Sequence, residues 1–134
     1  LAAQRATKKD VLHLREILAE AGARLEEGAA GWDAFIRVDN RIHMALARMA
    51  GNPIYESVLE TVYDHIHRYF DRFLPREEEM VRENHEDLRR IVKAVEERKA
   101  SRAGVLVQDH VRKFNRIMEE NARKQGAVKG QGRP

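Results

Sequence analysis

The sequence contains no cysteine among its 134 residues. This excludes a disulfide framework, a cysteine-ligated zinc site and a thiol nucleophile, and it fits a reducing compartment, so we expect a cytoplasmic protein. No apolar run approaches the roughly 20 residues that cross a bilayer, and no signal peptide opens the chain. We therefore expect no membrane partner. Proline and glycine are sparse, at 3 and 8 residues, and patterns typical of strands are nearly absent.

Charge of neither sign predominates. The 25 basic and 22 acidic residues leave a net charge of +3, and the two signs interleave as on the solvated faces of helices. A DNA-binding surface would instead show a clustered basic patch. The hydrophobic content of 43% and the length of the chain indicate one globular domain.

Apolar residues recur every three or four positions and predict five helices. The first helix follows Thr7, and the second runs from about Trp32 to Met49. The third begins at Asn52-Pro53, the fourth begins near Arg76 and the fifth follows Ser101. Short connections favour antiparallel neighbours, so the fold class is all-α, an antiparallel helical bundle. We expect residues 1–123 to form the domain, with residues 1–6 as the remainder of a truncated first helix. Residues 124–134 should form a flexible basic tail that frays from Gln125.

Four ionisable residues lie on apolar helix faces. Asp39 and His43 are one helical turn apart, and His85 and His110 lie on the core faces of the last two predicted helices. Burying these groups without partners is costly. One carboxylate and several imidazoles can satisfy each other around a divalent ion such as zinc, nickel, iron or manganese. Each residue alone is more often part of a hydrogen-bonded network, but the four together favour a shared metal site.

Residues of the third predicted helix are candidates for binding a ligand. Arg68 and Arg72 can pair with an anionic ligand, although such residues are more often solvated. Tyr63 is expected in the core or the wall of a cavity. His65 and His67 are two residues apart and face different sides of the helix, so only one of them can face the cavity. We assign His67 to it.

Three segments resemble one protein family. Residues 38–46 (VDNRIHMAL), followed by 49–53 (MAGNP), resemble the FCD domain, the C-terminal effector-binding domain of FadR-type GntR-family bacterial transcription regulators. Residues 87–95 (DLRRIVKAV) resemble its penultimate long helix, and 109–114 (DHVRKF) its last helix. The resemblance covers about residues 1–120.

The resemblance implies a helical bundle around a ligand cavity, in which one aspartate and three histidines hold a divalent ion, zinc or nickel for preference. Asp39 and His43 match the first two ligands and His110 the last. Leu88 occupies the position of the third, and His85, one turn earlier, is a substitute for it. Otherwise the site has three ligands or belongs to a metal-free branch of the family.

The resemblance further implies a small carboxylate effector, a homodimer and contact with DNA only through a winged helix-turn-helix domain that these residues do not contain. We therefore expect a sensor rather than an enzyme. One alternative is a metal-dependent hydrolase or oxygenase, for which the sequence shows no independent general base. Another is a metal-free structural dimerisation module with a filled core and no cavity.

Overall fold

The protein is an all-α bundle, as the sequence predicts. The computed structural model describes the backbone of residues 1–73 and 77–131, and their side chains except those of 64, 66, 67, 69–73 and 127–131. Within these residues no strand occurs. The elements are α1 (Ala2–Arg5), α2 (Lys8–Glu26), the 3₁₀ turn η1 (Gly28–Gly31), α3 (Trp32–Ala50), α4 (Pro53–Phe73), α5 (Glu78–Glu96) and α6 (Ala100–Gln131).

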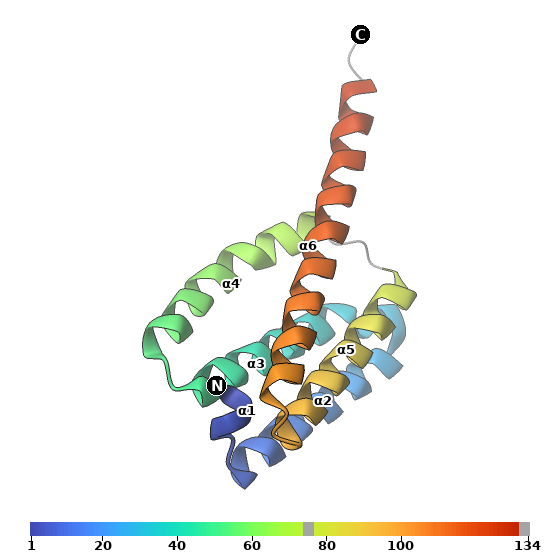
Figure 1. The fold of residues 1–134 in the computed structure, drawn as a ribbon. Coiled ribbons are helices and arrows are strands. Elements are labelled where there is room, and N and C mark those ends of the chain that lie inside the picture. Colours follow the sequence, from blue (N-terminus) through green and yellow to red (C-terminus); the bar gives the residue numbers. More distant parts are fainter. Residues whose placement is uncertain (74–76, 132–134) are drawn as a thin grey trace.

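The helices pack against one another as a bundle. α2 packs against both α3 and α5, and α5 packs against α6 (Figure 1). α4 contacts α3 and α6 but is not among the close neighbours of α2 or α5. α6 therefore lies between α4 and α5, and its C-terminal part extends beyond the other helices (Figure 1).

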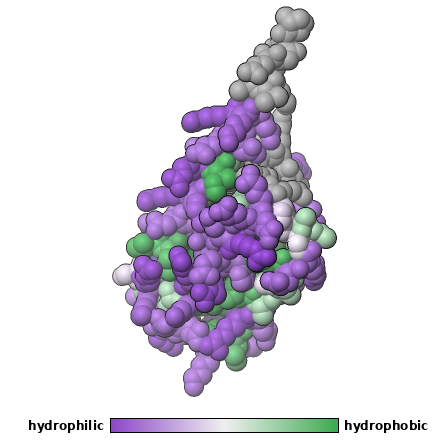
Figure 2. Space-filling model, turned by 90° about the vertical axis from the view of Figure 1, so that its right-hand side faces the viewer, coloured by the Kyte–Doolittle hydropathy of each residue, from purple (hydrophilic) through white to green (hydrophobic). Residues whose placement is uncertain are grey.

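The predicted apolar stripes of α2, α3 and α5 form the core, whereas α4 exposes Ile54, Val58 and Val62 of its own predicted stripe. Leu14, Ile17, Phe35, Ile42 and Leu88 are fully buried where α2, α3 and α5 meet. Removing apolar side chains from water is the main favourable term in folding, at roughly 25 cal/mol per Å². Figure 2 shows one face of the molecule with mostly hydrophilic residues and scattered apolar groups.

Local signals fix one end of each of three helices. Thr7 Oγ1 accepts a hydrogen bond from the Asp10 amide at 3.1 Å, and Asp10 Oδ2 accepts one from the Thr7 amide at 2.8 Å, so a capping box begins α2. Gly51 ends α3 with a φ of 71°, a left-handed conformation that glycine adopts without strain. Asn52 Oδ1 then accepts hydrogen bonds from the amides of residues 54 and 55, which begins α4.

The described part of the chain begins and ends with the helices α1 and α6. The short α1 is attached to the bundle by Arg5, whose Nη1 donates to the carbonyl of Ala50 at 2.8 Å, and by Arg98, whose Nη2 donates to the carbonyl of Ala6 at 3.1 Å. At the other end, α6 continues to Gln131 rather than ending near Gln125. Single glycines lower helix stability by about 1 kcal/mol without breaking the helix, so they predict its end poorly. The domain boundary at residue 123 remains a prediction.

No helix in the described part of the chain is both long enough and apolar enough to cross a bilayer.

Candidate metal centre and ligand pocket

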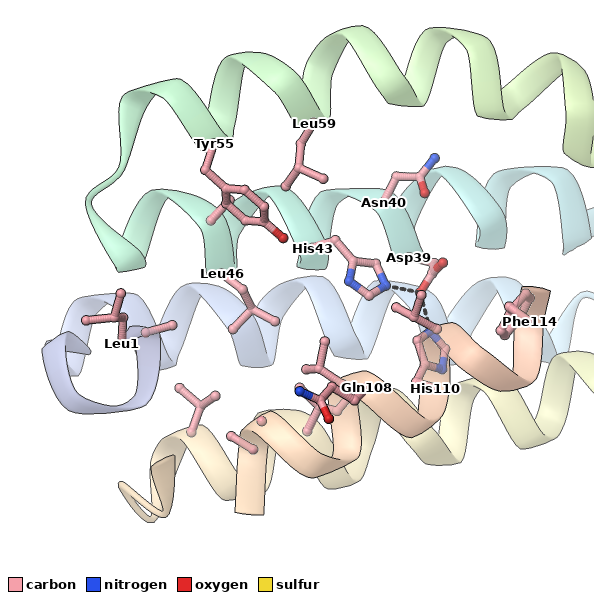
Figure 3. A pocket seen from close by; sticks show the side chains of 18 of the residues that line it. Leu1, Asp39, Asn40, His43, Leu46, Tyr55, Leu59, Gln108, His110 and Phe114 are labelled. Carbon is pink, nitrogen blue, oxygen red and sulfur yellow. Dashed lines mark ion pairs between the residues drawn. The ribbon is translucent and has the colours of Figure 1, made fainter. Parts of the chain in front are cut away.

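A pocket of about 690 Å³ lies between α3, α4 and α6. Residues of α1 and α5 complete its wall, and Figure 3 shows it from close by. Most of the described side chains that line it are apolar, and its polar residues include Asp39, His43 and His110. The volume is in the range of pockets that hold small molecules, about 300–1,000 Å³.

Asp39, His43 and His110, the triad, come together at this pocket. α3 supplies Asp39 and His43 one turn apart, and α6 supplies His110 (Figure 3). Asp39 Oδ1 lies 3.4 Å from His43 Nε2 and 4.0 Å from His110 Nε2. The two imidazole rings are stacked, with centroids 5.4 Å apart. One ligand atom from each residue lies within 4.8 Å of the others, a spacing at which a metal ion can bind all three.

The buried carboxylate of Asp39 fits a cation. Asp39 and His110 are only 7% and 4% exposed, and Asp39 Oδ1 accepts no hydrogen bond from any described residue. A buried carboxylate oxygen in this condition costs free energy unless a positive group satisfies it. A divalent ion between the carboxylate and the two imidazoles supplies that group, so the residues present fit a metal.

Burial and charge act differently on the two histidines. Burial disfavours the protonated form of His43, but the attraction of the nearby Asp39 carboxylate outweighs burial and raises the pKa of His43. For His110, burial dominates and lowers the pKa despite the attraction of Asp39. His110 is therefore neutral at pH 7, which is the form that binds a metal.

A second carboxylate orients His110. Asp87 Oδ2 lies 3.1 Å from His110 Nδ1 and 2.7 Å from the Nζ atom of Lys113. An Nδ1–H that donates to Asp87 leaves the lone pair of Nε2 directed toward Asp39. Histidines that bind metals commonly donate their other ring nitrogen to a carboxylate in this way. Sequence reasoning missed Asp87, since a half-buried aspartate on a helix gives no signal of a partner on the next helix.

His85 does not join the triad. Its ring lies beside Phe35, with ring centroids 6.2 Å apart, and its Nε2 atom is 3.4 Å from the Cβ that an alanine would have at Gly22. In the part of the chain that the structure describes, the group of possible metal ligands consists of Asp39, His43 and His110. The reason is helical phase, because at its position in α5 His85 faces α2 rather than α6.

The four predicted ligand-binding residues differ in their placement. Tyr63 lines the pocket. Burial, and then the negative charge of Asp39, raise the pKa of Tyr63 above its usual value, so its hydroxyl is a neutral hydrogen-bond donor. Arg68 is exposed and is not part of the pocket wall. The side chains of His67 and Arg72 lie outside the described residues.

Comparison with known proteins identifies the family. No curated protein and no solved structure matches the chain. The model of one family, the FCD domain, matches residues 1–113. That segment contains α1 to α5, the start of α6 and all three residues of the triad. Because the match covers most of the sequence, the chain belongs to the FCD domain family, the effector-binding domains of GntR-family regulators.

Proposed function

We propose that this FCD domain senses a small organic acid, which binds to a divalent transition-metal ion held by Asp39, His43 and His110. FCD domains are regulatory rather than enzymatic. The observation that carries the proposal is the buried Oδ1 atom of Asp39, which has no hydrogen-bond donor and faces the Nε2 atoms of two imidazoles.

The donor set suits zinc or nickel. One carboxylate and two imidazoles are ligands that these ions accept, whereas calcium prefers oxygen donors throughout. Three protein ligands leave at least one coordination position for another donor. The ion, when bound, supplies a Lewis-acidic position that a carboxylate of the effector can occupy.

The other residues of the site prepare it for this ligand. Asp87 holds the His110 ring in place through Nδ1, and Tyr63 offers a neutral hydroxyl to a ligand oxygen. Apolar side chains such as Ile91 and Val107 line much of the rest of the pocket. Low local polarity strengthens each electrostatic contact to a bound anion.

Binding of an effector in this pocket can change the binding of DNA. The pocket is bounded by α3, α4 and α6, so a ligand that contacts all three favours one arrangement of these helices over others. We propose that this arrangement shifts the population of DNA-competent homodimers in the cytoplasm, through a DNA-binding domain outside these residues. His85, which faces α2, has no part in this mechanism.

Two observations favour a sensor over the alternatives. Among the described residues that line the pocket, Asp39 is the only acid, so a hydrolase would lack a general base separate from the metal ligands. A structural module with a filled core would lack a pocket, and this chain has one of about 690 Å³.

The test is the metal content of the untagged chain, purified without chelator and measured by mass spectrometry. We expect about one equivalent of zinc or nickel. His110→Ala should lose it, while the matched variant His85→Ala should retain it. A chain that stays free of metal after reconstitution would contradict the metal-dependent mechanism. Loss in both variants, with the helix content of each unchanged by circular dichroism, would place His85 among the ligands.

A further inference from the structure

Away from the triad, most of the wall of the pocket is apolar. Its larger aliphatic side chains come from four helices, and Figure 3 shows Leu46 and Leu59 on the same side of the triad as Leu1. The larger members of this wall are Leu46 on α3, Leu59 on α4, Ile91 and Val95 on α5, and Val107 and Met118 on α6. The rest of a ligand that is held at the triad therefore packs mainly against apolar side chains.

The described residues of the pocket wall offer no side chain with a second positive charge. Among its described lining residues there is no lysine or arginine, and the polar side chains other than the triad are neutral: Asn40, Tyr55, Tyr63, Gln108 and Asn115. Arg68, the described candidate for pairing with an anion, is exposed and lies outside the wall. A second carboxylate of a ligand would thus be buried without a cationic partner, which is unfavourable.

From these two features we infer that the effector is a monocarboxylic acid with an apolar body, rather than a dicarboxylic acid. The inference rests on the proposed function, which places one carboxylate at the metal. The inference adds that the part of the effector other than this carboxylate is apolar. The volume of about 690 Å³ accommodates a body of several carbons.

The test is a series of calorimetric titrations of the zinc-loaded chain. The probes are butanoate, hexanoate and octanoate, with adipate as the dicarboxylate that matches hexanoate in carbon number. Each added methylene should tighten binding about fourfold until the pocket is full. Adipate should bind at least about tenfold more weakly than hexanoate, because its second carboxylate loses hydration without gaining a partner.

The outcomes separate this inference from the function on which it rests. Adipate that binds as tightly as hexanoate, or an affinity that does not change with chain length, overturns the apolar-acid inference and leaves the metal-bound acid in place. Failure of all four acids to bind the zinc-loaded chain overturns both. Hexanoate that binds equally with and without zinc supports the apolar acid and contradicts the role of the metal.

A pair of variants on α6 locates the binding. Val107 lines the pocket, whereas Val105 is 50% exposed and does not. Val107→Thr keeps the shape of the side chain but places a hydroxyl against the apolar body, and should weaken hexanoate binding about threefold or more. Zinc affinity should be unchanged, which shows that the fold is intact. Val105→Thr should change neither affinity, and equal losses in the two variants would overturn the placement of the ligand.

Discussion

His110 Nδ1 lies 3.1 Å from Asp87 Oδ2, although the two residues are 23 positions apart in the sequence. The contact exists because α5 and α6 pack side by side. It sets which ring nitrogen of His110 carries the proton and which faces Asp39. Lys113, one turn further along α6, lies 2.7 Å from the same Asp87 oxygen and balances its charge. Asp87 therefore acts on the metal centre through His110.

Replacing Asp87 should weaken metal binding without unfolding the chain. Asp87→Ala removes the acceptor that fixes the His110 ring, and such a loss typically lowers metal affinity by about tenfold to hundredfold. The measurement is competition for zinc against a chromophoric chelator. Asp109→Ala is the matched control, since Asp109 is an exposed neighbour of His110. Equal zinc affinity in wild type and Asp87→Ala would show that the contact does not support the site.

Removing the buried side chain of Leu88 should destabilise the bundle. Leu88 is 0% exposed in the core, and Leu→Ala changes at such positions cost about 2–5 kcal/mol of unfolding free energy because a cavity remains. Urea denaturation measures the loss. Leu12→Ala, at a position that is 56% exposed, should change stability by less than about 0.5 kcal/mol. A Leu88 variant as stable as the Leu12 variant would contradict the placement of Leu88 in the core.

The capping box of α2 should make stability depend on pH in the acid range. The pKa of Asp10 is lowered, first by its hydrogen bond from the Thr7 amide and then by the one from the Thr7 hydroxyl. A depressed pKa means that the stabilisation is fully present above the unfolded value, about 4, and is lost as the pH falls through the lower folded value. Asp10→Asn should therefore lower stability by roughly 0.5 kcal/mol at pH 7 and by less at pH 2–3.

Urea midpoints at pH 7 and pH 2.5 check this expectation. Glu16→Gln, at an exposed site further along α2, serves as the control that removes an acid without removing a cap. A difference between wild type and Asp10→Asn that stays constant from pH 7 to pH 2.5 would show that the Asp10 carboxylate does not act through its charge.

The sequence by itself determined the local features of this protein. The apolar spacing predicts α2 to α6, because helices have a fixed period of 3.6 residues. The capping pair of Thr7 and Asp10 lies within one turn, so its residues identify it without further context. Asp39 and His43 could likewise be placed on one inward face, since only the phase of a single helix was needed.

Only the tertiary structure decided which neighbouring helix each residue of α5 faces. α5 packs against α2 on one side and α6 on the other, so a residue on its buried stripe can face either neighbour. His85 faces α2, beside Gly22 and Phe35, whereas Asp87 faces α6 and reaches His110. The apolar periodicity of a helix predicts which of its side chains are buried. The partner that each buried side chain contacts depends on how whole helices pack. That packing is determined jointly by residues that are distant in the sequence.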